Sequence, residues 1–265
     1  MAAWAAEGEV RVSTSMARHT AGRLSWAVTD SIAMTGRNLR RLMRAPDQVM
    51  FTLVSPIMFT LLFRYVFGGA IKGLDGINYV NYLIPGIAVQ TAIFAAGNSG
   101  FGMADDRGKG FIDRLRSLPM ARSAVLAGRV AADTLSNAVG LIVIVLAGLA
   151  VGFRPHSVPG LILGLLVLLA FALAICFVFA LVGLYASNVQ TVNAATFPVV
   201  FPLTFASSAF VPTSTMPSWL RAFADHQPVT TVIDALRALT IGDISAAQRQ
   251  ALFAGQSTAS LVIQS

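Results

Sequence analysis

The sequence contains little charge and little cysteine. Only 12% of its 265 residues are charged, compared with about 25% in soluble domains. Its single cysteine, Cys176, excludes an internal disulfide. By contrast, 55% of the residues are hydrophobic and the mean hydropathy is +0.70. This balance excludes an ordinary soluble domain and indicates membrane spans of about 20 apolar residues each.

Motifs for catalysis, metal binding and nucleotide binding are also missing. The three histidines are scattered, with no HExxH, so we expect no metal site. There is no GxSxG, so we expect no enzyme on this chain. Residues 102–110 superficially resemble a phosphate loop, but five residues instead of four separate Gly102 from Gly108. Gly110 also stands where the loop needs serine or threonine for magnesium. We therefore expect no cofactor on this chain.

Five apolar runs predict five membrane-spanning helices in an all-α polytopic protein. They cover residues 49–67, 80–103, 124–153, 158–185 and 192–210. Residues 251–265 are too short and too polar for a sixth span. Either the chain ends with five spans or a sixth lies beyond this sequence, and we expect the second.

An amphipathic stretch precedes the first span. Residues 24–44 carry apolar side chains on one side of a helix and basic ones on the other, including Arg37, Arg40 and Arg41. This pattern is typical of a helix in the membrane interface, on the anionic cytoplasmic leaflet. We expect residues 1–22 to be a polar, poorly ordered tail, and residues 23–265 to form a single transmembrane domain.

The basic residues predict the orientation. Thirteen of the 19 lysines and arginines either precede the first span or lie between the second and third, counting Arg129 near the start of the third. The positive-inside rule places both regions in the cytoplasm, so the N-terminus is expected inside a cell membrane. Because the charges cluster at span ends, the pI near 10.5 does not indicate nucleic-acid binding.

The segment 104–122 is densely charged. Phe111, Leu115 and Leu118 recur at helical spacing and share one face, and Pro119 ends the helix. The remaining positions carry Arg107, Asp113, Arg114 and Arg116. The pattern fits either an ordinary positive-inside loop or a helix that inserts its apolar face into a partner's groove.

Four polar residues within the predicted spans are candidates for a substrate pathway: Arg64, Gln90, Asn98 and Asn137. Arg64 either reaches the outer interface or faces a central cavity. The three amides either line an internal seam or join neighbouring helices. Asp133 lies one turn after Arg129, which predicts a local ion pair.

Residues 211–242 contain three prolines between apolar residues at helical spacing. The predicted orientation places this region outside the cytoplasm. We expect two short helices that dip into the outer half of the membrane, where backbone is tolerated when it packs against protein.

Two stretches resemble a known family. Residues 107–133 read RGKGFIDRLRSLPMARSAVLAGRVAAD, and residues 210–242 read FVPTSTMPSWLRAFADHQPVTTVIDALRALTIG. Both are similar to the daunorubicin-resistance type permeases, the membrane subunits of bacterial ATP-binding-cassette exporters with a type-2 membrane domain. The order of elements over residues 24–242 is similar too. That family has six spans, and this sequence supplies five.

The resemblance implies specific roles. The segment 104–122 would be the coupling helix on a separate ATPase subunit that binds ATP and Mg²⁺, and Arg37, Arg40 and Arg41 would flank that contact. Residues 211–242 would form re-entrant helices near an outer gate, with Pro212, Pro217, Trp219, Pro228, Asp234 and Arg237 as candidates. Two membrane subunits, identical or similar, would export a drug, lipid or glycolipid.

The alternative is a stand-alone secondary carrier coupled to an ion gradient. Such a carrier should hold acidic residues deep in its spans, and here the span centres are nearly free of carboxylates. An intramembrane enzyme would need a nucleophile and base, or metal ligands, at membrane depth. The sequence offers neither set.

Overall fold

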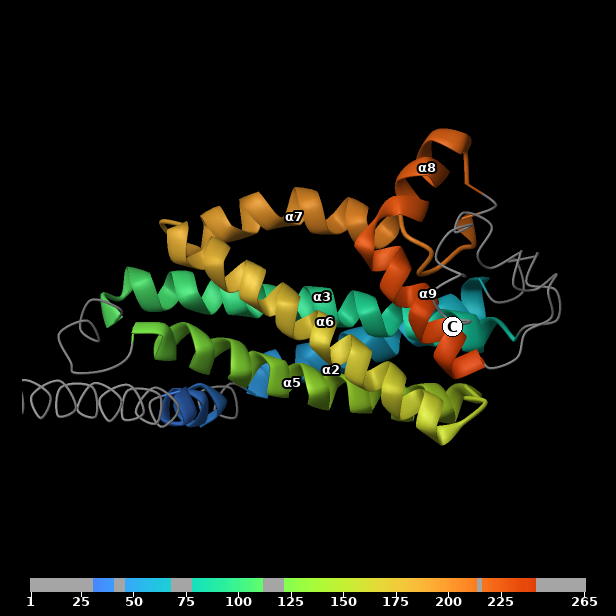
Figure 1. Cartoon of the computed structure of the whole chain (residues 1–265), viewed down its shortest axis with the longest axis horizontal. Coiled ribbons are helices and arrows are strands. Elements are labelled where there is room, and N and C mark those ends of the chain that lie inside the picture. The colour runs from blue at the N-terminus through green and yellow to red at the C-terminus, as the bar shows by residue number, and fades with distance from the viewer. Residues whose placement is uncertain (1–30, 41–45, 68–77, 112–121, 214–215, 242–265) are drawn as a thin grey trace, which may run out of the picture.

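A computed structural model describes residues 31–40, 46–67, 78–111, 122–213 and 216–241 (Figure 1). Over these ranges every regular element is a helix. A helix over residues 31–40 is followed by α2 (Pro46–Leu62), the π-helix η1 (Phe63–Phe67), α3 (Tyr79–Gly108), α5 (Arg122–Val151), α6 (Val158–Tyr185), α7 (Val189–Phe205), α8 (Ser218–His226) and α9 (Pro228–Ile241). The predicted all-α polytopic membrane protein is confirmed.

Three described helices, α3, α5 and α6, are long and apolar enough to cross a membrane. They correspond to the second, third and fourth predicted spans, and α6 has the predicted bounds. The first and fifth predicted spans are shorter helices: α2 and α7 have 17 residues each, which extend about 25 Å. η1 continues α2 to residue 67. The tail 1–22 and residues 242–265 lie outside the described residues.

Polar residues in the turns fix where two helices begin. The Ser157 side chain accepts a hydrogen bond from the Gly160 amide at 3.1 Å, with Pro159 in the first turn of α6. The Asn188 side chain accepts from the Thr191 amide at 2.8 Å and starts α7. Both are N-caps that satisfy amides without a partner inside the helix.

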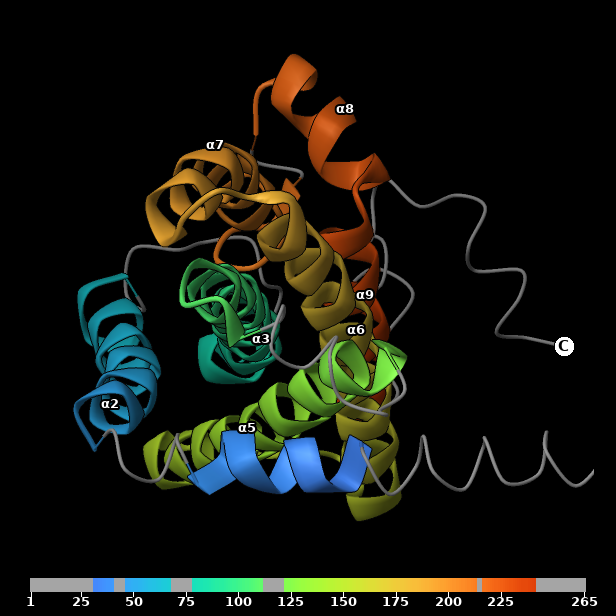
Figure 2. The same cartoon turned by 90° about the vertical axis from the view of Figure 1, so that its left-hand side faces the viewer.

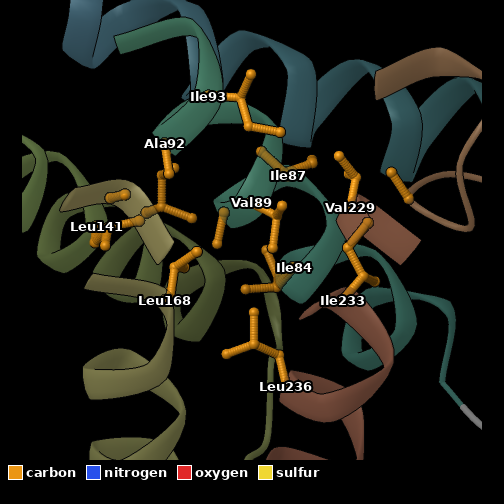
Figure 3. Close-up of a cluster of buried hydrophobic side chains, with 14 of the residues drawn as sticks. Ile84, Ile87, Val89, Ala92, Ile93, Leu141, Leu168, Val229, Ile233 and Leu236 are labelled. Atoms are coloured by element: carbon orange, nitrogen blue, oxygen red, sulfur yellow. The ribbon is translucent and has the colours of Figure 1, made fainter. Parts of the chain in front are cut away.

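Helix α3 forms the centre of the bundle, with α2, α5, α6 and α7 around it (Figures 1 and 2). In the most apolar stretch of α3, 78% is buried inside the protein, whereas the corresponding share is 33% in α5 and 28% in α6. The core joins α3 to α6 and α9, where Ile84 lies near Leu168 and Ile233 (Figure 3). Apolar side chains left exposed on α5 and α6 suit contact with lipid.

Glycines allow two close contacts between elements. A Cβ atom on Gly183 of α6 would overlap the carbonyl oxygen of Gly100 on α3. A Cβ atom on Gly128 of α5 would overlap the Met34 side chain in the helix over residues 31–40. Small residues therefore let α6 lie directly on α3, and let the N-terminal helix lie across the start of α5 (Figure 2).

Candidate functional site

The predicted cytoplasmic end holds a junction between the N-terminal helix and the charged segment. The Arg37 guanidinium lies 3.1 Å from the Asp106 carboxylate at the end of α3. The same guanidinium stacks over the Phe111 ring, 4.0 Å from its centroid. Asp106 is only 5% exposed, so this ion pair is less screened than a surface pair. Arg37 thus joins the N-terminal helix to the charged segment. The sequence predicted both regions as parts of the coupling contact, but it gave no sign that they touch each other.

The N-terminal helix is also anchored to α5. The Thr35 hydroxyl donates to the Gly128 carbonyl at 3.3 Å, and the Asn38 amide donates to the same oxygen at 3.4 Å. Because Gly128 has no side chain, the two helices approach closely enough for these bonds. The helix over residues 31–40 is therefore attached to both α3 and α5.

The charged segment does not begin where the sequence indicated. Helix α3 continues to Gly108, so the first five residues of the segment 104–122 belong to the span. An ion pair between Lys109 and Asp105, at 2.8 Å and one turn apart, favours this extension. Arg107 donates to the carbonyls of Leu184 and Ala186 at 2.6 and 3.3 Å and so binds the end of α6.

The other predicted coupling residues divide into two groups. Arg40 is exposed, and Phe111 is partly buried beneath Arg37. Six lie outside the described residues: Arg41, Asp113, Arg114, Leu115, Arg116 and Leu118.

An apolar cavity of about 450 Å³ lies between α2, α3 and α7. Six of its thirteen lining residues are phenylalanines, and none is charged. Phe197, Phe201 and Phe205 on α7 follow at intervals of four residues, with ring centroids 5.4 and 4.4 Å apart. This spacing puts all three rings on one helix face. This spacing is visible in the sequence, although none of the three phenylalanines was predicted as a site residue.

Two of the four predicted pathway residues line this cavity. Gln90 and Asn98 lie on the α3 wall, whereas Arg64 and Asn137 are not among the lining residues. The Asn137 side chain is buried and lies 3.5 Å from the Cys176 sulfur on α6, so it joins helices instead. Of the two alternatives that the sequence left open for the amides, contact between neighbouring helices therefore applies to Asn137, whose position on α5 places it on the other side of α3.

The predicted ion pair between Arg129 and Asp133 is confirmed. Arg129 Nε lies 2.7 Å from the Asp133 carboxylate, which also accepts from the Ser99 hydroxyl at 2.6 Å. Arg129 further donates to the Asn98 carbonyl at 2.8 Å. Both charges are therefore satisfied between α3 and α5.

The opposite end holds a buried arginine. Arg237 of α9 is 1% exposed and donates to the carbonyls of Tyr82 and Ser208, at 3.0 and 2.7 Å. It pairs with Asp234 at 3.2 Å, and it stacks over the Tyr82 ring at 3.5 Å. Burial raises the pKa of Asp234 to about 6, although the neighbouring Arg237 opposes that shift. The sequence marked Arg237 as a candidate, but it gave no sign of its partner Tyr82.

The two short helices expected in residues 211–242 are confirmed as α8 and α9. The Gln227 side chain between them donates to the Ala206 carbonyl at 2.8 Å, which ties them to the end of α7. Pro217 precedes α8 and Pro228 begins α9, both exposed, while Pro212 is buried. Trp219 is 74% exposed.

Comparison with known proteins gives consistent matches. Residues 29–241 match the family of ABC-2 type transporters. A daunorubicin resistance ABC transporter permease of Streptomyces coeruleorubidus is 33% identical over 217 residues, which cover 82% of this chain and 76% of that protein. A doxorubicin resistance ABC transporter permease of Mycobacterium tuberculosis is 30% identical over 221 residues, covering 77% of this chain and 76% of that protein.

Proposed function

Since the chain belongs to the ABC-2 type transporter family, we propose that it is the membrane subunit of an ATP-driven exporter. The substrate would be a hydrophobic or amphipathic molecule, such as a drug, lipid or glycolipid, that leaves the cytoplasm or the inner leaflet. A separate ATPase subunit would hold ATP and Mg²⁺. A second membrane subunit, identical or similar, would complete the transporter, and the N-terminus would lie in the cytoplasm.

The junction around Arg37 is the observation that carries this proposal. Asp106 and Phe111 both lie in the segment 104–122 that would contact the ATPase, and Arg37 binds both. A displacement of that segment would therefore move the end of α3 and the N-terminal helix together. An ordinary loop would need no ion pair between a buried carboxylate and a separate helix.

Helix α3 connects this junction to the cavity. It carries Asp106 near one end, Gln90 and Asn98 on the cavity wall, and Tyr82 near its other end. From Asp106 to Gln90 it extends about 24 Å. Packed on α6 through Gly100 and Gly183, it would transmit motion as one rigid element.

The cluster around Arg237 supports the proposal that residues 211–242 lie near an outer gate. It fixes α9 and the turn after α7 onto Tyr82 of α3. Phe210 in that turn stacks on Phe63 of η1, with centroids 4.3 Å apart. Opening this end would require α3 and α9 to move together or the cluster to break.

The test is a double substitution of the apolar face, Phe111→Ala with Leu115→Ala, in the complete transporter reconstituted in liposomes. We expect normal membrane insertion, with loss of ATP-dependent substrate export. Lys109→Ala is the control, because Lys109 is exposed and its pair with Asp105 contributes little. Normal export by the double variant would contradict the proposal.

A further inference from the structure

Arg64 is a partly buried cation at the end of the first span that is predicted to face outward. In the part of the chain that the structure describes, the ion pairs involve other basic side chains, and the Arg64 guanidinium has no acceptor. It lies 5.9 Å from the centroid of the Tyr65 ring, at the outer limit for a cation–π contact. Because arginine stays charged, a partly buried guanidinium without a counter-ion is unfavourable. An anion bound at Arg64 would remove this cost.

The length of the helix places Arg64 at the boundary of the membrane core. α2 has 17 residues from Pro46, and η1 continues it for five more. Arg64 therefore lies about 27 Å from Pro46 along the helix, and the hydrocarbon core of a bilayer is about 30 Å thick. The long arginine side chain can reach the level of the lipid headgroups from there. Arg64 also lies in the π-helical turn, a rare distortion that is frequent at functional sites.

The turn between α5 and α6 brings a second arginine to the same boundary. A guanidinium nitrogen of Arg64 lies 4.0 Å from the position that a Cβ atom on Gly152 would occupy. Arg154 follows two residues later, so its Cα is at most about 7.6 Å from that of Gly152. Gly152 has φ +108°, and the Asn81 side chain accepts from the Arg154 backbone amide at 2.9 Å, which fixes the turn. The Arg154 side chain itself is exposed and has no acceptor within the described ranges.

The surface beside Arg64 indicates from which side an anion would approach. Leu61, Leu62, Tyr65 and Val66 are all exposed, Tyr65 to 76%. Such an apolar surface faces lipid in a membrane-spanning helix, and tyrosine is enriched where the hydrocarbon meets the headgroups. The anion that lies at this depth on a lipid-facing surface is the phosphate group of a phospholipid. Arginine binds phosphate through two parallel N–H···O hydrogen bonds.

We propose that Arg64 and Arg154 together bind the phosphate group of a phospholipid in the leaflet at this end, which the predicted orientation makes the outer one. The lipid is a bound component at the edge of the bundle, because neither arginine lines the cavity between α2, α3 and α7. The inference goes beyond the proposed transport function and does not depend on it.

The test measures which lipid lies beside Arg64. The photoreactive amino acid p-benzoylphenylalanine replaces the exposed Tyr65 in the full chain, which is reconstituted in vesicles of digalactosyldiacylglycerol with a minor fraction of phosphatidylglycerol. Only the second lipid carries a phosphate, and mass spectrometry counts each lipid cross-linked after irradiation. One charge-assisted hydrogen bond corresponds to about tenfold enrichment of phosphatidylglycerol over its share of the vesicle. The same photoreactive group at Leu146, exposed on α5, should capture the two lipids in their bulk ratio.

Arg64→Gln with Arg154→Gln removes both charges and should abolish the enrichment, while the buried Cys176 stays protected from a thiol dye as evidence of folding. Arg221→Gln is the matched control, because Arg221 lies on α8 and donates to the Thr213 carbonyl at 3.0 Å; it should preserve the enrichment.

Three results would overturn the proposal. The first is no enrichment in the chain that keeps both arginines, and the second is unchanged enrichment in the double variant. The third is an equal loss in Arg221→Gln, because general positive charge would then attract the lipid. Excess glycerol phosphate, the soluble headgroup without acyl chains, should not compete; displacement by it would assign the site to a soluble anion and overturn the lipid as its ligand.

Discussion

Removing Arg237 should destabilise the protein more than any other single change to a polar side chain at the outer end. The guanidinium is buried and binds carbonyls on α3 and in the turn after α7. In Arg237→Met, Asp234 loses its cation while staying buried. Breaking a buried pair by removing one partner costs about 3–5 kcal/mol, which for a domain of this size lowers the melting temperature by roughly 6–20 °C.

A second variant distinguishes the effect of leaving Asp234 without its cation from the effect of losing the packing of the Arg237 side chain. In the double variant Arg237→Met with Asp234→Leu, no buried charge remains without a partner. Replacing both members of a buried pair by apolar residues is often nearly neutral. The double variant should therefore melt above Arg237→Met, although the Tyr82 and Ser208 carbonyls still lack their donor.

The buried Cys176 provides the assay. A thiol-reactive fluorescent dye added during heating in detergent reports when this single cysteine becomes accessible, and so gives the melting temperature. A double variant no more stable than Arg237→Met would show that the unpaired Asp234 is not the cause of the destabilisation. An unchanged melting temperature in Arg237→Met would contradict the predicted destabilisation itself.

The destabilisation caused by Arg237→Met should depend on pH, and the direction of that dependence follows from the pKa of Asp234. The pKa of Asp234 is about 6 with Arg237 present, because burial raises it, and loss of the cation should raise it further. A raised carboxyl pKa favours the folded state when the group is protonated, and that contribution is lost as the pH rises through the folded value. The difference in melting temperature between Arg237→Met and the unsubstituted protein should therefore be smaller at pH 5 than at pH 8.

Two other substitutions test the helix contacts. Arg37→Ala should reduce stimulation of the ATPase subunit several-fold while membrane insertion stays normal, because the N-terminal helix loses its contacts with α3; Lys109→Ala, measured in parallel, should change little. Gly183→Ala should lower the melting temperature, because the added methyl group would overlap the Gly100 carbonyl. Gly140→Ala is its control: nothing lies within 4 Å of the added group, so a stabilisation of about 0.5–1 kcal/mol is expected. Equal effects of the two alanines would contradict the close crossing.

The sequence predicted local features well. The apolar run 158–185 defined α6 completely, because a long uninterrupted apolar stretch between polar turns has only one reading in a membrane. The pair Arg129–Asp133 followed from spacing alone. The two short helices after residue 211 followed from prolines and helical periodicity.

Contacts between distant segments could not be predicted in the same way. Arg37 lies 69 positions before Asp106, and Arg237 lies 155 positions after Tyr82. No local pattern marks such pairs, since each arginine also fits an ordinary surface role. The boundary of α3 was misplaced because hydropathy falls after Met103 while the helix continues on charged residues.

The cavity was predicted only in part for the same reason. Periodicity places Gln90 and Asn98 on one face of α3, but only the packing of α2 and α7 makes that face the wall of a cavity. Asn137 has the same chemistry and occupies the other side of α3, near Cys176. Residue type alone could not separate these amides.

We propose that a separate ATPase subunit docks at the end of the molecule that holds Arg37 and Phe111. The most direct measurement is purification of the chain from its native membrane in mild detergent, followed by identification of the proteins that accompany it. We predict that an ATPase subunit co-purifies, and that Phe111→Ala with Leu115→Ala abolishes the association while Lys109→Ala does not. Isolation of the folded chain without any ATPase would contradict the account.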